Sequence, residues 1–511
     1  MMDSHHQAAA SRAAGGPAEA APADGEPARR RLAGLAIGLA PFLAMLALAP
    51  PAGMEPAAWH TAAVAVLMAA LWVSEALPIP ITALLPLILF PLLGIARLEA
   101  TAAPFANPLI FLFMGGFMIG LAMERWALHR RIALALLGRV GARPAGLIAG
   151  FLGTAAALSM WVSNTATAVM MLPIALSVIR LVAPPEREPA DGPARGLAVA
   201  LLLAVAYGAS IGGLATLVGT PPNALLAGYM EANYGIEIGF AQWMIVGLPL
   251  SLAMLAAAFA LLTALARQTP ADAMQGAAAA IRAAAAEQGR WTAGEKRVAG
   301  VFAATALLWI FRPLLGAALP WLQLSDPAIA ILGAVALFVI PENLREGRFL
   351  MNWEWARRLP WDVLLLFGGG LSLAAAVNET GLAGWIAGRL GGLAALPTIL
   401  AVLLVTTLII FLTEMTSNTA TAATFLPLVG SLAVGFGAHP LLLAAPAAVA
   451  ASCAFMLPVA TPPNAIVFGS GRLRIVDMAR TGLWLNLAGI ALITLVPYTL
   501  LPLAFDLALV R

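Results

Sequence analysis

The pentapeptide Ser-Asn-Thr-Ala-Thr occurs twice in this chain, in the stretches WVSNTATAVMMLPIA (161–175) and MTSNTATAATFLPLV (415–429). The two copies lie 254 positions apart in a chain of 511 residues, and a Leu-Pro pair follows each copy at the same distance. The sequence around both copies is almost purely apolar. A duplicated polar motif in an apolar setting indicates that the two halves of the chain carry the same structural element.

The composition is that of a membrane protein. Hydrophobic residues make up 61% of the chain and charged residues 10%, and the mean hydropathy is +0.91. A soluble domain has roughly 25% charged residues, so this chain has too little charge to cover a surface that faces water. Apolar runs of about 20 residues are typical of bilayer-spanning helices. The sequence therefore predicts an all-α polytopic membrane protein embedded in a lipid bilayer.

The expected spans number about eleven. They lie near 32–50, 57–76, 80–96, 107–124, 195–232, 240–266, 297–320, 326–341, 361–378, 440–470 and 481–508. The pentapeptides interrupt two further apolar stretches, 145–181 and 396–434. We interpret these two as re-entrant hairpins, which enter and leave the membrane on the same side.

The distribution of basic residues favours the hairpin interpretation. With the N-terminus in the cytoplasm, 24 of the 28 Lys and Arg residues fall on the cytoplasmic side. The exceptions are Arg97, Arg312, Arg389 and Arg511. This asymmetry is what the positive-inside rule describes. If either hairpin crossed the membrane fully, every later loop would change sides and the asymmetry would disappear.

The motifs also predict the organisation of the chain. We expect a disordered cytoplasmic tail over 1–28, a first transmembrane helix over 29–56, and two repeats over 57–267 and 295–511, joined by a cytoplasmic linker over 268–294. Each repeat has five crossings and one hairpin. Because five is odd, the second repeat has the opposite orientation to the first, as in the inverted repeats of secondary transporters.

A second pair of motifs follows the pentapeptides: GTPPNALL at 219–226 and ATPPNAIV at 460–467. Proline suits the first turn of a helix because its missing N–H would be unpaired there. Thr220 and Thr461 are therefore expected as N-caps of helices that restart after an unwound stretch. Ser, Thr and Asn are favoured cap residues, so the tips Ser163-Asn164-Thr165 and Ser417-Asn418-Thr419 are expected to start the returning hairpin arms. Non-helical backbone at membrane depth is tolerated only where protein buries it or where it lines a cavity.

Four helix N-termini with hydroxyl and amide side chains suit an anion, because they present free N–H groups and the positive ends of helix dipoles. No Lys or Arg lies within about ten residues of either pentapeptide. Free carbonyl groups and Ser, Thr and Asn oxygens are hard ligands that suit Na⁺. The residues therefore favour a carboxylate substrate whose charge is neutralised by bound Na⁺.

With its paired SNT and TPPN motifs, the chain resembles the divalent anion:sodium symporter family, the INDY-type dicarboxylate transporters, over residues 57–508. The resemblance implies eleven transmembrane helices and two hairpins in an inverted repeat. It also implies a scaffold domain, a transport domain, a homodimer and alternating access of the elevator type. Substrates in the family are C4 dicarboxylates such as succinate, malate and fumarate, with citrate, 2-oxoglutarate or sulfate in some branches.

The resemblance also implies the residues of the site. Those of a first Na⁺ site are Ser159, Ser163, Asn164 and the backbone of Gly219. Those of a second Na⁺ site are Thr413, Ser417, Asn418 and the backbone of Ala460. Those that would meet the substrate are Asn164, Thr165, Asn418, Thr419, Thr461 and Pro462. The hydroxyl groups of Ser159 and Thr413 favour sodium coupling over the sodium-independent exchange that the family also contains.

Glu414, beside the second pentapeptide, has two interpretations. Its counterpart 254 positions earlier is Met160. An acidic residue inside a membrane is a functional candidate, so Glu414 could set the cation affinity or carry a proton. Alternatively, nearby backbone N–H groups satisfy its carboxylate.

Other classes of function have little support. The basic residues are scattered, so no nucleic-acid partner is expected, and the five histidines and one cysteine show no ligand spacing for a transition metal. The chain has no HExxH or GxSxG motif, so we do not expect an enzyme or an organic cofactor. The expectation is Na⁺-coupled dicarboxylate symport across the cytoplasmic (inner) membrane. The alternatives are a sodium-independent dicarboxylate exchanger, or a Na⁺-coupled citrate or sulfate transporter of the same fold.

Overall fold

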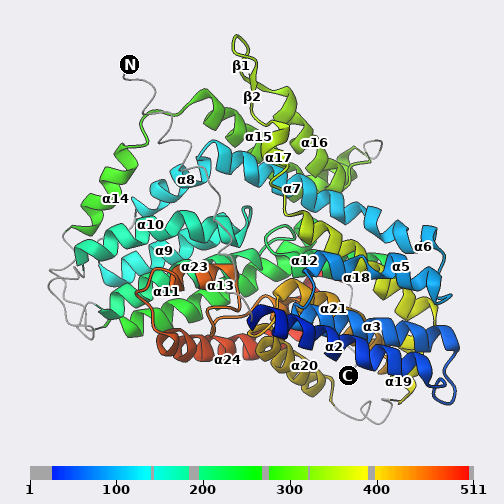
Figure 1. Cartoon of the computed structure of the whole chain (residues 1–511). Coiled ribbons are helices and arrows are strands. Elements are labelled where there is room, and N and C mark those ends of the chain that lie inside the picture. The colour runs from blue at the N-terminus through cyan, green and yellow to red at the C-terminus, as the bar shows by residue number, and fades with distance from the viewer. Residues whose placement is uncertain are drawn as a thin grey trace.

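The computed structural model describes residues 26–139, 143–182, 195–267, 276–319, 321, 323–389 and 397–505. The predicted disordered tail over 1–28 therefore lies almost entirely outside the described residues, and so does part of the predicted linker over 268–294. The described part is mostly helical (Figure 1). This agrees with the expected fold class.

The helices of the first half run from α2 to α13. They are α2 (Glu26–Ala47), α3 (Pro56–Ser74), α4 (Ile79–Ala83), α5 (Leu85–Leu92), α6 (Leu98–Ala102), the 3₁₀ helix η1 (Ala103–Ala106), α7 (Pro108–Arg125), α8 (Leu128–Leu137), α9 (Pro144–Ser159), α10 (Asn164–Val182), α11 (Arg195–Gly213), α12 (Pro221–Tyr234) and α13 (Phe240–Leu265).

The second half follows helix α14 (Ala277–Ala286), which lies within the predicted linker. Its elements are α15 (Ala293–Ala318), α16 (Asp326–Val339), β1 (Pro341–Asn343), β2 (Arg348–Phe349), α17 (Trp353–Ala356), α18 (Trp361–Glu379), α19 (Leu382–Arg389), α20 (Thr398–Thr413), α21 (Asn418–Gly435), α22 (Leu441–Ala451), α23 (Pro462–Phe468), α24 (Ile475–Thr499) and α25 (Leu501–Ala504).

Eight helical segments among the described residues are long and apolar enough to cross a membrane. They are α3, α6 to α7, α10, α11, α13, α15, α18 and α24. Shorter apolar helices of 10–17 residues include α9, α16, α20 and α22. The chain is thus a multi-pass membrane protein, while the expected number of eleven crossings stays a prediction.

The duplicated motifs produce duplicated structure. Both SNTAT segments join two helices through a short turn, α9 to α10 and α20 to α21. Both TPPN segments begin a helix after an unwound stretch, so that α11 is followed by α12 and α22 by α23. Proline occupies the first helical position of both α12 and α23, and Thr220 and Thr461 precede them with extended backbone, as predicted.

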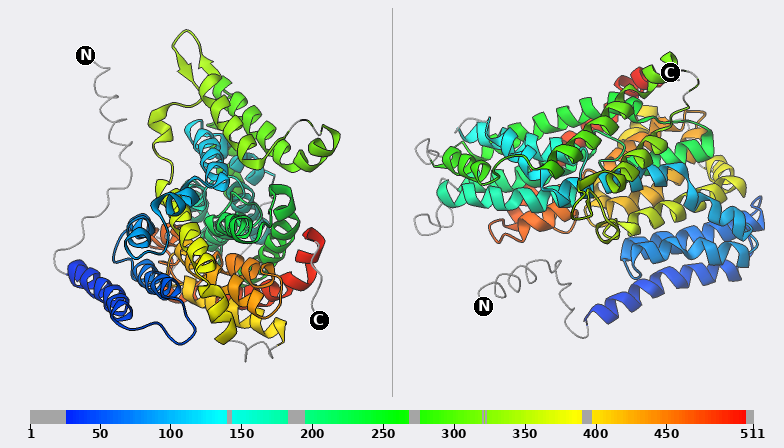
Figure 2. Two further views of the ribbon diagram at one scale, coloured as in Figure 1. Left: turned by 90° about the vertical axis from the view of Figure 1, so that its right-hand side faces the viewer. Right: turned by 90° about the horizontal axis from the view of Figure 1, so that it is seen from above.

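The structure departs from the sequence-based expectation in two places. The predicted span over 80–96 is divided into α4 and α5, because Pro80, Pro86 and Pro91 remove N–H donors from this stretch. A two-stranded antiparallel hairpin, β1 with β2, follows α16 and projects from the helical body (Figures 1 and 2). The expected all-α fold did not include this hairpin.

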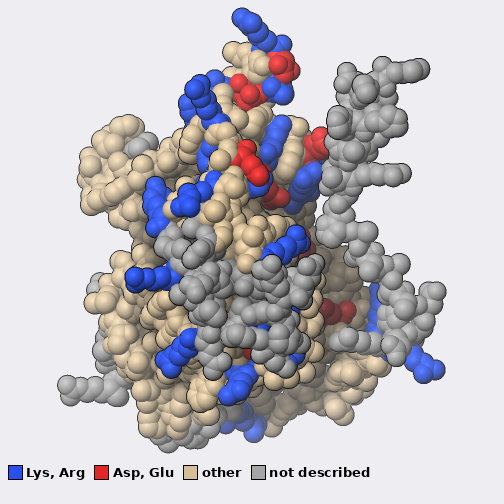
Figure 3. All heavy atoms as spheres, turned by 90° about the vertical axis from the view of Figure 1, so that its left-hand side faces the viewer, with Lys and Arg blue, Asp and Glu red and all other residues tan. Residues whose placement is uncertain are grey.

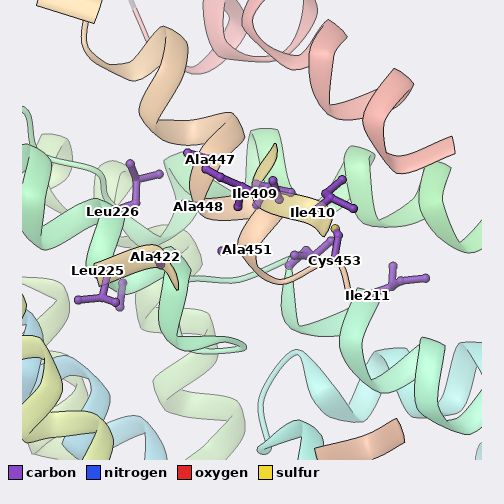
Figure 4. Packing of buried hydrophobic residues seen from close by; sticks show 14 of the residues in the cluster. Ile211, Leu225, Leu226, Ile409, Ile410, Ala422, Ala447, Ala448, Ala451 and Cys453 are labelled. Carbon is purple, nitrogen blue, oxygen red and sulfur yellow. The ribbon is translucent and has the colours of Figure 1, made fainter. Parts of the chain in front are cut away.

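Three of the four broken helices, α11, α12 and α22, are largely buried. Helix α11 is buried on almost all sides. A Cβ atom on its Gly208 would come within 2.5 Å of the Leu152 carbonyl oxygen, so this glycine allows α9 and α11 to pack closely. Figure 4 shows apolar residues of both halves in one core, among them Leu225 of α12, Ile409 of α20 and Ala448 of α22. This core fixes the two unwound stretches relative to the hairpin turns.

Candidate functional site

The returning arm of each hairpin begins at the asparagine of its pentapeptide, at Asn164 in α10 and at Asn418 in α21. Ser163 lies just before α10, and its Oγ accepts a hydrogen bond from the backbone N of Ala166 at 3.2 Å. Ser417 is the N-cap of α21 by position, but its side chain makes no capping hydrogen bond. Both arms thus begin at the predicted tips, with a side-chain cap from Ser163 in the first half and none from Ser417 in the second.

Oxygen atoms gather around the amide of Asn164. The buried hydroxyl of Ser159 lies 2.5 Å from Oδ1 of Asn164. The carbonyl oxygens of Gly219 and Ala209 each lie 3.2 Å from the same amide atom. With the oxygen turned inward, this amide completes a set of four oxygens that a cation can satisfy. The neighbouring protein oxygens alone favour the nitrogen turned inward, where it donates hydrogen bonds to Ser159, Gly219 and Ala209, so the oxygen-inward set requires a cation to balance it.

Two glycines allow this close arrangement. A Cβ atom on Gly213 would lie 2.9 Å from both the Asn164 amide oxygen and the Gly219 carbonyl oxygen. A Cβ atom on Gly219 would lie 2.5 Å from the Gly213 carbonyl oxygen. Atoms at such distances cannot coexist without movement of the backbone. The unwound stretch after α11 therefore reaches the hairpin turn only because these positions have no side chain.

The second half repeats the central contact. The buried Thr413 hydroxyl lies 2.8 Å from Oδ1 of Asn418 and 2.8 Å from the carbonyl oxygen of Ala451. Ser417 directly precedes Asn418, and Ala460 directly precedes Thr461, the N-cap of α23. Among the described contacts, neither Ser417 nor Ala460 is hydrogen-bonded to the Thr413–Asn418 pair. The structure thus joins two of the four expected residues of this second set.

The expected substrate residues differ in accessibility. Thr165 and Pro462 are exposed, and Asn418 and Thr419 are partly exposed. Thr461 is buried, and its side chain accepts a hydrogen bond from the backbone N of Asn464 at 3.3 Å. Asn164 is partly exposed as well, so Thr461 alone among the expected substrate residues is buried.

Thr220 does not have the expected side-chain role. Its backbone is in the N-cap position of α12, but its side chain makes no capping hydrogen bond. Instead, Oγ1 of Thr220 lies 3.3 Å from Oγ of Ser452, which follows α22. The unwound stretches of the two halves thus meet at this pair of hydroxyl groups.

Sequence reasoning missed the carbonyl groups of Ala209 and Ala451. Each takes part through its backbone alone, so no side-chain pattern marks it. The set in the first half comprises hydroxyl, amide and carbonyl oxygens without a carboxylate, which suits a hard cation of low charge such as Na⁺.

Glu414 directly follows Thr413, in the second half, and is 3% exposed. Its Oε1 accepts hydrogen bonds from the backbone N of Phe455 at 2.7 Å and from Nδ2 of Asn486 at 2.7 Å. Its Oε2 accepts from the backbone N of Leu457 at 3.0 Å, and both oxygens accept from that of Met456. The structure thus favours the interpretation in which backbone N–H groups satisfy the carboxylate.

The chain is similar to known proteins along most of its length. Residues 29–503 match the family model described as the sodium:sulfate symporter transmembrane region. The sodium-dependent dicarboxylate transporter SdcS of Staphylococcus saprophyticus is 41% identical over 481 residues, which cover 92% of each chain. SdcS of Staphylococcus aureus strain USA300 is 41% identical over 482 residues, which cover 93% of this chain and 92% of the relative.

Two solved structures have a similar fold. The YdaH transporter of Alcanivorax borkumensis aligns with a TM-score of 0.56 at 18% identity, covering 78% of this chain and 86% of that one. MtrF of Neisseria gonorrhoeae aligns with a TM-score of 0.50 at 14% identity, covering 78% of this chain and 83% of that one. At these identities the similarity concerns the fold alone.

Proposed function

The chain belongs to the sodium:sulfate symporter family, also called the divalent anion:sodium symporters, and from this we propose that it couples Na⁺ entry to the import of a C4 dicarboxylate such as succinate, malate or fumarate. The relatives that are 41% identical over most of the chain are sodium-dependent dicarboxylate transporters. The oxygen set around Asn164 is the observation that carries the sodium part of this proposal.

The charge of the site supports coupled binding. The hairpin turns offer hydroxyl groups, amides and helix N-termini but no Lys or Arg within about ten residues. A dianion at such a site would keep most of its charge unbalanced. Two sodium ions, one held at Ser159, Asn164 and Gly219 and one at Thr413 and Asn418, would supply the missing positive charge. Sodium therefore binds first, and the exposed Thr165 and partly exposed Thr419 receive the carboxylates.

The membrane potential sets a condition on this symport. Each net charge moved through the field is worth about 2.3 kcal/mol per 100 mV. Two Na⁺ with one dianion carry no net charge, so the potential drives import only if more than two Na⁺ accompany the substrate.

We place the chain in the cytoplasmic (inner) membrane with its N-terminus in the cytoplasm. Figure 3 shows many Lys and Arg side chains on the face near α8 and α14, with few acidic side chains between them. The positive-inside rule supports assigning this face to the cytoplasm. Alternating access by an elevator motion of a transport domain against a scaffold domain, within a homodimer, belongs to the same proposal.

A second candidate is Na⁺-coupled transport of citrate or sulfate. Hydroxyl groups, amides and helix N-termini bind carboxylate and sulfate in much the same way, and the matching family model is named for sodium:sulfate symport. Competition of citrate and sulfate against labelled succinate distinguishes these substrates.

Uptake of radiolabelled succinate into proteoliposomes tests the proposal. Wild type is compared with Asn164→Ala, Asn418→Ala and the control Asn343→Ala, whose residue lies in the β1–β2 hairpin. We expect uptake that needs an inward Na⁺ gradient, is lost in both site variants and is kept in the control. Undiminished uptake with choline in place of Na⁺ would instead support the sodium-independent exchanger. Normal transport by both site variants would reject the site.

A further inference from the structure

The fourth residue of each TPPN motif is a fully buried asparagine that binds the backbone of the preceding unwound stretch. Nδ2 of Asn223 lies 3.2 Å from the carbonyl oxygen of Gly213 and 2.9 Å from that of Thr216. Nδ2 of Asn464 lies 3.2 Å from the carbonyl oxygen of Ala454 and 3.0 Å from that of Leu457. Neither asparagine was assigned a role from the sequence.

The two sets of contacts share two spacings, and Nδ2 of Asn223 also lies 3.3 Å from the carbonyl oxygen of Leu214. Each asparagine donates to the carbonyl groups ten and seven residues before it. Unwinding a helix frees carbonyl groups, and a buried carbonyl without a partner costs stability. A side-chain amide nitrogen carries two hydrogens and can satisfy two such groups. In both halves, therefore, an asparagine amide satisfies carbonyl groups that the unwinding has freed.

The amide nitrogen of each asparagine, and not its oxygen, faces the carbonyl groups. Within the described part of the chain, Oδ1 of Asn223 and Oδ1 of Asn464 accept no hydrogen bond, although both residues are fully buried. Turning either amide would place an oxygen against carbonyl oxygens. Each side chain is thus held by the backbone that it binds.

The bound backbone faces the hairpin turns. In the first half, Gly213 accepts from Asn223 and packs against both Asn164 and Gly219. In the second half, Leu457 accepts from Asn464 through its carbonyl and donates its N–H to Glu414, the neighbour of Thr413. Each asparagine therefore fixes the stretch that lies against the oxygen atoms of its own half.

We propose that Asn223 and Asn464 are positioning residues for the two Na⁺ sites, each tying the unwound backbone to the helix that restarts behind it. This inference rests on the proposed function. Neither side chain is required to touch the ion. Without the amide, the freed carbonyl groups would rearrange, and the backbone oxygens of the sodium site would move away from the hairpin turn.

The test uses Asn223→Leu and Asn464→Leu, which remove the donor at similar size. The control is Thr305→Val, which removes a buried hydroxyl whose one hydrogen bond within the described residues is to the Val301 carbonyl of its own helix. One readout is the Na⁺ concentration for half-maximal succinate uptake, with the maximal rate recorded separately. A second is the Na⁺-dependent rise in melting temperature of the purified protein without substrate, with choline as reference.

We expect the half-maximal Na⁺ concentration to rise about tenfold or more in both asparagine variants, because the loss of ordinary hydrogen bonds is of that size. The Na⁺-dependent stabilisation should shrink in parallel, and Thr305→Val should change neither. A lower maximal rate with an unchanged half-maximal Na⁺ concentration would overturn the inference, since a purely structural role gives that result.

Two further outcomes are separated by the design. If wild type itself shows no Na⁺ dependence in uptake or in melting temperature, the proposed function fails, and the inference falls with it. If the leucine variants do not fold, Asn223→Ser and Asn464→Ser, which keep one donor, decide the matter. Unchanged sodium dependence in the serine variants, or their failure to fold, would also overturn the positioning role.

Discussion

Oγ1 of Thr220 lies 3.3 Å from Oγ of Ser452, and both residues are buried. Thr220 precedes α12 in the first half, and Ser452 follows α22 in the second. The two unwound stretches therefore touch, although they are 232 residues apart in the chain. A displacement of one stretch therefore changes the contact with the other. This contact offers a physical route for coupling between the two proposed sodium sites.

The glycine at position 219 and the alanine at position 460 give a matched pair of tests. Gly219→Ala would place a Cβ atom 2.5 Å from the Gly213 carbonyl oxygen. We expect it to reduce Na⁺-dependent succinate uptake at least tenfold. Ala460→Gly removes a methyl group at the corresponding position and should keep most of the activity. If Gly219→Ala is as active as Ala460→Gly, the close approach of Gly219 to Gly213 is not needed for transport.

Replacing Glu414 tests the structural interpretation of this carboxylate. In Glu414→Gln, an amide NH₂ group would face backbone N–H groups that now donate to a carboxylate oxygen. We expect the free energy of unfolding to fall by about 2 kcal/mol or more, since hydrogen bonds to charged groups are worth about 1.5–3 kcal/mol. Chemical denaturation in detergent measures this. Asn486→Leu, which removes one donor of several, should cost less.

The opposite result for Glu414 would also be informative. If Glu414→Gln is as stable as wild type but has lost pH-dependent or Na⁺-dependent uptake, the carboxylate acts in ion binding and not in fixing the backbone.

A hydrogen bond between α12 and α18 tests the proposed elevator motion. Nδ2 of Asn378 in α18 lies 2.6 Å from Oδ1 of Asn233 in α12, and α18 packs on α3, α4 and α5. If α12 moves against α18, this bond must break in each cycle. Cross-linking Asn233→Cys to Asn378→Cys with Hg²⁺ should stop uptake, and an excess of a small thiol, which displaces the protein thiolates from Hg²⁺, should restore it. The one natural cysteine, Cys453, is buried, so it serves as an unreactive background.

Full uptake by the cross-linked protein would show that α12 and α18 move as one body. Each single cysteine variant, treated in the same way, controls for modification of one side alone.

His129 of α8 should make stability depend on pH. Its Nδ1 lies 2.9 Å from the carbonyl oxygen of Met123. Burial lowers its pKa from the usual 6.5, although the Met123 carbonyl and the charge of Glu124 act to raise it. Between the lowered pKa of the folded protein and 6.5, the unfolded chain binds a proton that the folded chain does not. Stability should therefore fall with decreasing pH, by up to about 1.4 kcal/mol per pH unit.

Melting temperatures between pH 7.5 and pH 5 measure this effect. His129→Gln keeps a donor for the Met123 carbonyl but takes up no proton, so its curve should be flatter than that of wild type. Identical slopes would rule out His129 as the group responsible.

The duplicated motifs made much of the fold predictable from the sequence. Proline after threonine identified the starts of α12 and α23, and the SNT tripeptides identified the starts of α10 and α21. These predictions succeeded because they rest on local backbone chemistry. The division between α4 and α5 and the β1–β2 hairpin were missed, since hydropathy averages over such short elements.

The candidate site was predictable only in part. Ser159, Asn164, Thr413 and Asn418 form the expected pairs, because hydroxyl and amide side chains leave a pattern in the sequence. The carbonyl group of Ala209 leaves no pattern. The contacts of Asn223 depend on how far the chain unwinds between α11 and α12, which is set by packing and not by the motif.

The absence of Lys and Arg near the pentapeptides has a consequence for leakage. A carrier with its own arginine at the hairpin turns could move a dianion without sodium. Each such uncoupled transport step would let accumulated substrate leave the cell. Here a half-loaded carrier would take uncompensated charge into the hydrocarbon region, which is costly. Under the proposed coupling of two Na⁺ to one dianion, the neutral turns would therefore prevent futile cycling, because only the empty and the fully loaded forms would cross at low cost.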